Sequence, residues 1–171
     1  TRFGPMVHAS LNAAEESSGK LVTSVRSHAE QLALQKDQEI ILIDGPPGIG
    51  CPVISAITGV DLVVIVTEPT ISGIHDLHRI IQLADHFSIP KAVIINKKDI
   101  NGKRTAEIET FCQSHQIPLI GSVPYDLHFT SAMIEEKLIP EYETGELSET
   151  IHQIWSSINK LLTKKNKDHK Q

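Results

Sequence analysis

The sequence is poor in the residues that mark several common classes of protein. It contains two cysteines, Cys51 and Cys112, without the spacing of a disulfide scaffold, which suits a reducing compartment. Aromatic residues make up 4% of the chain and its net charge is -5. A basic surface with stacking rings is therefore not expected, and the composition argues against a nucleic-acid partner.

Long apolar runs are missing as well. No run approaches the roughly 20 residues that a helix needs to cross a bilayer, and the amino end has no signal-peptide pattern. We therefore expect a cytoplasmic protein with no membrane partner. Because the sequence begins at Thr1, we also expect that it is not a complete translation product.

The pattern of apolar residues indicates an α/β fold. The chain has 171 residues and 40% hydrophobic content, enough for one sizeable core. Short apolar runs of strand length alternate with stretches of helical periodicity, which predicts a doubly wound, mostly parallel sheet with helices on both faces. Strands are expected over residues 6–11, 39–44, 61–67, 91–95 and 117–123. Helices are expected from about residue 18, over 53–57, after a cap at Ser72, and over 101–115, 129–135 and 147–162.

We predict a single domain over residues 1–162. No internal repeat and no linker rich in Ser, Gly or Pro divides the chain. The apolar stripe of the last helix, which includes Ile151, Ile154 and Trp155, is interpreted as core. Residues 163–171 (TKKNKDHKQ) form a run of charge after this helix and are expected to be a solvated, mobile tail.

The segment at residues 40–52 is the most informative part of the sequence. Four apolar residues suit a buried strand, and Asp44 follows them at the carboxyl end, where ligands of parallel sheets collect. A carboxylate there can orient water on Mg²⁺. Glycines in the following loop let the backbone approach a phosphate, and the prolines stiffen it. An ordinary strand-to-helix turn is the alternative. The candidate site residues of this loop are Asp44, Gly45, Pro46, Pro47 and Gly48.

Polar residues also follow two later strands. Asn96, Lys97 and Asp99 place amide, ammonium and carboxylate groups just past the strand at 91–95, a suitable arrangement for the edge of a purine. Pro124 and Tyr125 end the next strand and are expected to form a wall for the same base. A polar turn of no further function remains the alternative for the Asn-Lys-Lys-Asp run.

Five segments of the chain, in order along most of its length, carry a family resemblance. The chain resembles the MinD/ParA class of P-loop ATPases, and more narrowly the branch in which a ferredoxin-like segment is inserted into the ATPase domain. The matching segments are ESSGKLVT (16–23), IDGPPGIGCP (43–52), VTEPT (66–70), SGIHDL (72–77) and INKKDIN (95–101).

The resemblance implies roles for the candidate residues. Asp44 would be the Walker B carboxylate that holds Mg²⁺ through water, and residues 45–48 would form the switch II loop. Asn96 would contact adenine, with Pro124 and Tyr125 near the base. The implied protein binds and hydrolyses ATP with Mg²⁺, acts as a homodimer, and has a link to iron-sulfur or electron-transfer chemistry.

The chain departs from this family at its amino end. Members carry a Lys-Gly-Gly-x-Gly-Lys-[Thr/Ser] loop that holds the phosphates. The nearest segment here, residues 15–21, lacks the first glycine and has Leu21 in place of a hydroxyl, so Lys20 is expected only to start a helix. The chain therefore resembles the part of the family that follows the inserted domain, and any 4Fe-4S clusters are expected in the missing part.

The missing part includes the central P-loop strand. In the family this strand lies between the strand ending at Asp44 and the strand beginning at Asp61, so the sheet is expected to be incomplete. Either these two strands close up, or a missing amino-terminal segment or a partner chain fills the gap. The isolated chain is expected to be inactive as an ATPase.

Cys51 lies seven residues after Asp44. In the related nitrogenase iron protein, a cysteine in a comparable place helps hold a 4Fe-4S cluster across a dimer. We therefore treat Cys51 as a candidate cluster ligand, with a small buried residue as the alternative.

Two further functions stay open. A GTP-binding switch is possible because residues 96–99 match the guanine-reading Asn-Lys-x-Asp, although Pro47 occupies the glycine position of the usual Asp-x-x-Gly. A non-catalytic scaffold completed by a partner chain is the other.

Overall fold

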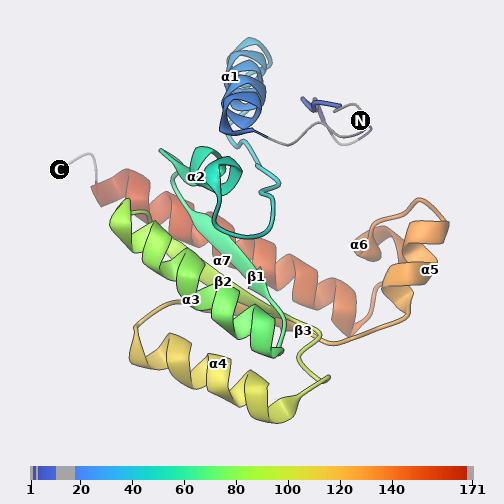
Figure 1. Ribbon diagram of the computed structural model, residues 1–171. Helices are drawn as coiled ribbons and strands as arrows, with labels where there is room; N and C mark the ends of the chain where they lie inside the picture. Colours follow the sequence, from blue (N-terminus) through green and yellow to red (C-terminus); the bar gives the residue numbers. More distant parts are fainter. Residues whose placement is uncertain (1, 3, 11–17, 169–171) are drawn as a thin grey trace. The chain divides into compact units, whose positions relative to one another are not determined.

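The computed structural model describes residues 2, 4–10 and 18–168, with side chains described as far as residue 164 (Figure 1). Contacts within the chain group it into two compact units, residues 1–59 and residues 60–171, and each is described here by itself. The single domain expected over residues 1–162 therefore stays a prediction.

The first unit is built on two helices, α1 (Gly19–Gln35) and α2 (Cys51–Ile57). The hydroxyl of Ser18 accepts a hydrogen bond from the Leu21 amide at 3.3 Å and caps α1, as preferred at helix amino ends. Lys20 lies in the first turn of α1 and is exposed, as expected for a residue that starts a helix.

Arg26 of α1 bridges the two helices through hydrogen bonds. The guanidinium of Arg26 donates to the carbonyl oxygens of Ser55 and Thr58 at 2.6 and 2.7 Å. Carbonyls at the end of a helix have no intrahelical partner, so these bonds satisfy the carboxyl end of α2. The contact fixes the end of α2 against α1.

The strand predicted over residues 39–44 is wrong. These residues pair with no strand, and Ile40, Ile41 and Leu42 are exposed, Leu42 by 83%. An apolar run becomes a strand only where a neighbouring strand can pair with its backbone, and the described chain supplies none here. Residues 6–10 form no strand either, and Leu11 lies outside the described residues, as do residues 15–17 of the proposed loop remnant.

The second unit contains a parallel sheet, in agreement with the predicted fold class. The strand order is β1-β2-β3, and Thr67 of β1 lies opposite Ile95 of β2. The central strand is a nearly continuous apolar run with four successive buried residues, as is typical of a parallel strand covered on both faces. The strands are β1 (Val63–Thr67), β2 (Lys91–Asn96) and β3 (Leu119–Val123).

Helices cover both faces of this sheet. Two of them, α3 and α4, lie on one face, and the long helix α7 crosses the other (Figure 1). This is the arrangement that the alternation of apolar runs predicts. The helices of the second unit are α3 (Ile71–His86), α4 (Gly102–Ser114), α5 (His128–Ile134), α6 (Ile139–Tyr142) and α7 (Glu146–Asp168).

Two elements near the carboxyl end differ from prediction. No helix was expected over residues 139–142, yet the short helix α6 forms there with Pro140 in its first turn, where a missing amide donor costs nothing. The helix α7, expected to end at residue 162, continues to Asp168, so residues 163–168 are helical; a mobile tail over residues 163–171 stays a prediction. Lysine is a good helix former, and no Gly or Pro interrupts these residues.

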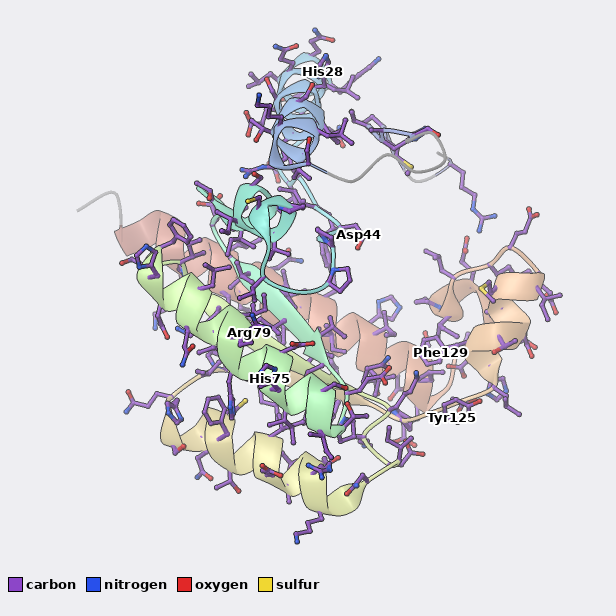
Figure 2. All side chains as sticks on the ribbon, in the orientation of Figure 1. His28, Asp44, His75, Arg79, Tyr125 and Phe129 are labelled. Atoms are coloured by element: carbon purple, nitrogen blue, oxygen red, sulfur yellow. The ribbon has the colours of Figure 1, made fainter. Side chains whose placement is uncertain are left out.

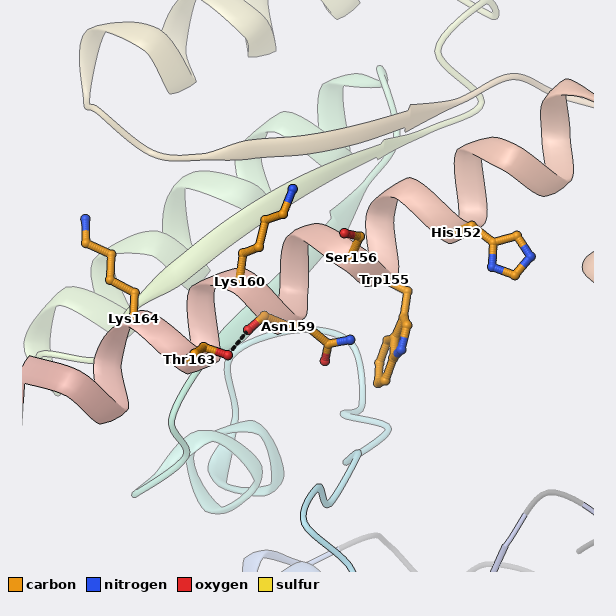
Figure 3. A pocket seen from close by; sticks show the side chains of 7 residues that line it. All are labelled: His152, Trp155, Ser156, Asn159, Lys160, Thr163 and Lys164. Atoms are coloured by element: carbon orange, nitrogen blue, oxygen red, sulfur yellow. Dashed lines mark hydrogen bonds between the residues drawn. The ribbon is translucent and has the colours of Figure 1, made fainter.

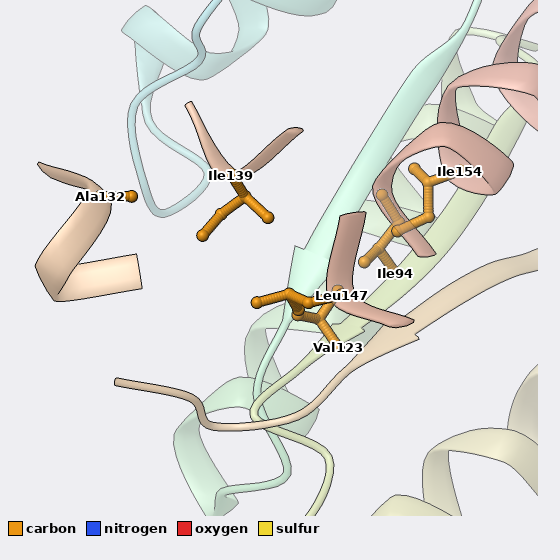
Figure 4. Close-up of a cluster of buried hydrophobic side chains, with 6 residues drawn as sticks. All are labelled: Ile94, Val123, Ala132, Ile139, Leu147 and Ile154. Atoms are coloured by element: carbon orange, nitrogen blue, oxygen red, sulfur yellow. The ribbon is translucent and has the colours of Figure 1, made fainter. Parts of the chain in front are cut away.

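A hydrophobic cluster fixes α7 on the sheet (Figure 4). Ile154 of α7 occupies the space that a side chain at Gly121 of β3 would fill. Burial of one such aliphatic side chain contributes about 1.5–3 kcal/mol, so the cluster is a main source of stability for the second unit. Its buried members are Ile94, Val123, Ala132, Ile139, Leu147 and Ile154.

The sheet ends at β1. In the described part of the chain no further strand pairs with β1, and Val66 of this strand is 62% exposed. An apolar edge strand with unpaired amides and carbonyls is a template for pairing with another strand. The described sheet therefore has an open edge along β1, and the absence of a central P-loop strand stays a prediction.

Candidate functional site

Polar side chains that follow β1 and β2 contact each other at the carboxyl edge of the sheet. The ammonium group of Lys97 lies 2.7 Å from Oε1 of Glu68, and the side-chain amide of Asn96 donates to the same oxygen at 3.4 Å. The side chains of Lys97 and Glu68 are 39% and 37% exposed. This cluster joins the β1–α3 turn to the β2–α4 loop and remains accessible to a ligand.

The same edge continues to β3. The carboxylate of Asp99 accepts a hydrogen bond from the backbone amide of Tyr125 at 2.7 Å, and the amide of Lys98 donates to the carbonyl of Val123 at 3.0 Å. Pro124 is half-buried, while Tyr125 is 57% exposed after the end of β3 (Figure 2). The predicted residues Asn96, Lys97, Asp99, Pro124 and Tyr125 therefore gather in one place.

The backbone at Lys97 is in a rare conformation. Its φ of 53° lies in the left-handed region, which costs a residue with a side chain about 1 kcal/mol or more. The surrounding loop holds it there, because the carbonyl of Lys97 accepts from the Ile100 amide and that of Lys98 accepts from the hydroxyl of Thr105 at 2.6 Å. Backbone strain of this kind gathers at binding sites.

The β1–α3 turn is tightly built. Thr70 caps α3 by accepting from the amide of Gly73 at 2.9 Å, and the buried hydroxyl of Thr67 donates to the carbonyl of Gly73 at 3.0 Å. A Cβ atom at position 73 would collide with the carbonyl oxygen of Glu68, so only glycine fits. The cap predicted at Ser72 is wrong, since the hydroxyl of Thr70 takes that place.

Asp44 and the Gly/Pro loop lie in the first unit, between α1 and α2 (Figure 2). Asp44 is exposed, and among the described residues no hydrogen-bond or ion-pair partner lies beside it. Gly48 has a φ of 89°, which a residue with a side chain rarely adopts. An exposed carboxylate of this kind is a suitable oxygen ligand for a hydrated Mg²⁺. A common site for Asp44 and the strand-end cluster stays a prediction.

The cysteines differ in their surroundings. Cys51 is exposed at the start of α2, whereas Cys112 is buried in α4, where burial raises the pKa of its thiol. No group of three or more His, Cys, Asp or Glu side chains in the described ranges is arranged to hold a metal ion. The role of Cys51 as a cluster ligand stays a prediction.

Asp126 follows Tyr125 and lies two residues before the first residue of α5. Its carboxylate accepts from the backbone amide of His128 at 2.8 Å, and this bond is the main reason why the pKa of Asp126 lies below its usual range, with a smaller contribution from the His128 side chain. The carboxylate thereby satisfies a free amide at the beginning of α5.

The outer face of α7 carries a shallow hollow (Figure 3). Trp155, which was expected in the core, is 44% exposed here, because it lies about 100° around the helix from the buried Ile154. Among the described residues, each helix is either too short or too polar to span a bilayer. The hollow is lined by His152, Trp155, Ser156, Asn159, Lys160, Thr163 and Lys164.

Sequence reasoning missed Glu68 as a member of the site. The VTEPT segment was interpreted through the backbone amides at the start of α3, which favour anions. In the structure the carboxylate of Glu68, in the same segment, faces Lys97 and Asn96. The signal was a carboxylate and a lysine, each placed just after a neighbouring strand.

Comparison with known proteins gives several similar sequences, of which two are described. An uncharacterised protein of Methanocaldococcus jannaschii is 27% identical over 158 residues, which cover 92% of this chain and 52% of that protein. The septum site-determining protein MinD of Helicobacter pylori is 33% identical over 112 residues, 58% of this chain and 41% of that protein. No family model matches the chain.

Two MinD structures share its architecture. The MinD of Pyrococcus horikoshii complexed with Mg-ADP superimposes with a TM-score of 0.68 at 19% identity, covering 86% of this chain and 59% of that one. The cell division ATPase MinD of Pyrococcus furiosus gives a TM-score of 0.65 at 17% identity, covering 84% and 59%. The chain has a MinD-like fold. This MinD-like chain spans about half the length of the curated relatives it matches.

Proposed function

We propose that this MinD-like chain is the carboxyl-terminal part of an ATPase and supplies the base-binding edge and the switch loop of its nucleotide site. The observation that carries the proposal is the convergence of Asn96, Asp99 and Tyr125 at the carboxyl ends of neighbouring parallel strands. Ligands of open parallel sheets bind at that edge. The similarity to MinD proteins, one of them complexed with Mg-ADP, supports a nucleotide as the ligand.

The residues divide into two roles. Asn96 and Tyr125 would contact adenine, the amide through hydrogen bonds and the exposed ring through stacking. Asp44 would hold Mg²⁺ through water, while residues 45–48 respond to the γ-phosphate. Phosphoryl transfer depends on positioning and charge stabilisation. Because this sequence has no glycine-rich loop with paired lysines, the groups that hold the phosphates would come from outside this chain.

The open edge of β1 is where the rest of the site would join. We propose that a strand from a missing segment or from a partner chain pairs with β1, next to the exposed Val66. The relatives are about twice as long as the matched region, which leaves ample sequence for such a strand and its phosphate-binding loop. Val66→Lys should weaken this association without unfolding the second unit.

Nucleotide binding and turnover test the proposal in a longer form that contains the additional strand and a glycine-rich loop with its lysines. This form, the completed protein, should bind Mg-ATP and hydrolyse it. Asp44→Asn should lower kcat by at least tenfold, because one electrostatic group in such a site contributes about that much or more. Glu135→Gln, in an exposed ion pair away from the strand ends, is the matched control. Equal turnover in Asp44→Asn and the wild type would contradict the proposal.

A GTP-binding switch is the second candidate, favoured by the literal match of residues 96–99 to Asn-Lys-x-Asp. In the structure one oxygen of Asp99 already accepts from the Tyr125 amide, so this carboxylate is partly engaged in holding the loop. The affinity of the completed protein for ATP against GTP decides between them. Tighter GTP binding would replace the ATPase proposal.

The remaining proposals concern assembly. We propose a homodimer in which Cys51 contributes to a 4Fe-4S cluster. Such a cluster normally takes four thiolate ligands, so Cys51 of each chain would act together with further ligands from elsewhere. Iron and acid-labile sulfide should fall in Cys51→Ser, and equal content in both proteins would remove the idea. A scaffold function would instead give stable association through β1 without nucleotide binding, and a monomer in light scattering would count against it.

A further inference from the structure

We propose that Glu68 is a positioning residue that sets the orientation of the Asn96 amide and thereby selects a 6-amino purine over a 6-oxo purine. The inference rests on the proposed function, because it concerns the choice of base at the same strand-end site. It adds a residue that the sequence did not indicate for this role.

Only one orientation of the Asn96 side-chain amide allows a hydrogen bond to Glu68. A carboxylate is an acceptor, so the group of Asn96 that faces it must be the NH₂ group and not the carbonyl oxygen. The structure has this arrangement, with Nδ2 of Asn96 at 3.4 Å from Oε1 of Glu68. Oδ1 of Asn96 is therefore directed away from Glu68.

The position of Glu68 itself is fixed before any ligand arrives. Lys97 holds the same carboxylate oxygen at 2.7 Å. The backbone of Glu68 is held within the turn, because its carbonyl oxygen accepts from the Thr70 amide at 2.8 Å. The amide orientation is thus imposed by the protein.

This orientation matches one purine edge. Asn96 presents the acceptor Oδ1 and the second hydrogen of its NH₂ group, a pair that fits the amino donor at position 6 and the N7 acceptor of adenine. A 6-oxo purine would place its acceptor oxygen against Oδ1. With Glu68 in place, Asn96 therefore favours adenine over guanine or hypoxanthine.

The test compares ADP with inosine diphosphate, which differ at position 6 of the base and carry the same phosphates. Dissociation constants are measured by NMR titration of the ¹⁵N-labelled chain, with the side-chain NH₂ signals of Asn96 followed in the same spectra. The wild type should bind ADP more tightly by on the order of tenfold, the lower end for a bidentate contact to a base.

Three variants separate positioning from folding. Glu68→Ala should bring the ratio of the two dissociation constants close to one, because the amide is then free to turn. Glu68→Gln should retain most of the preference, since its carbonyl oxygen can still accept from Asn96. In an Asn96→Ala background, Glu68→Ala should change the ratio no further. Glu135→Gln is the control and should behave as the wild type.

The outcomes are distinct. If the wild type binds both nucleotides and Glu68→Ala leaves their ratio unchanged, the positioning role is wrong and the proposed function stands. An effect of Glu68→Ala that persists in the Asn96→Ala background overturns the role as well. If the wild type binds neither nucleotide, the proposed function fails, and this inference fails with it.

Discussion

A few side chains at the strand ends hold the loops that follow β1, β2 and β3 in one arrangement. Glu68, Lys97 and Asp99 each make a contact that joins loops from different strands. These ion pairs and hydrogen bonds are partly exposed, so each is worth about 1 kcal/mol or less in stability. Their main effect is on geometry, because together they fix donors and acceptors at the carboxyl edge of the sheet.

The two thiols should react at different rates, because one is exposed and the other is buried. Cys51 is exposed and Cys112 is 1% exposed with a raised thiol pKa, so Cys51 should react with an aromatic disulfide reagent far faster at neutral pH. The native protein should show one rapid thiol, and the second should react only on unfolding. Cys51→Ser should abolish the rapid phase, and its survival in that variant would show that Cys112 is accessible.

The carboxylate of Asp126 gives a pH prediction. Its pKa is lowered in the folded state, so its stabilising contribution is present above the ordinary Asp pKa and is lost as the pH falls through the lower folded value. Chemical unfolding of the wild type should therefore lose stability relative to Asp126→Asn as the pH falls from about 4. The side-chain oxygen of asparagine can also accept from the His128 amide but does not titrate, so a constant difference between the proteins would contradict this.

At the scale of elements, the packing of α7 against the sheet is the contact most open to test. Gly121→Ala places a Cβ against Ile154 and should destabilise the second unit by about 1–3 kcal/mol through overpacking. Denaturant unfolding measures the change. Gly102→Ala, where a Cβ meets nothing, is the matched control. A loss equal to that of the control would mean that α7 does not pack on β3 as described.

The elements also show how far the sequence determines this fold. The apolar run of β2 and the amphipathic α3 were predictable, since each is buried by neighbours within the same unit. Residues 39–44 have an equally apolar run, yet they form no strand because a strand requires a partner and propensity alone supplies none. The site followed the same logic. Asn96, Asp99 and Tyr125 were placed by the parallel topology, whereas Glu68 became visible only through its side-chain contacts.

For the molecule as a whole, the proposed function gives this chain one side of a nucleotide site. The chain carries the strand-end cluster and an exposed Asp44, but its sequence has no loop with paired lysines for the phosphates. The isolated chain should therefore release phosphate from ATP no faster than buffer, and Asp44→Asn should change nothing. Turnover that exceeds the buffer rate and depends on Asp44 would contradict this division of the site.

The most direct test of the central claim maps Mg-ADP onto the chain by amide NMR. Saturating Mg-ADP should shift the signals of Glu68, of residues 96–99 and of Tyr125, and leave those of the outer face of α7 unchanged. Shifts confined to α7, or no shifts at the carboxyl ends of β1, β2 and β3, would contradict the account.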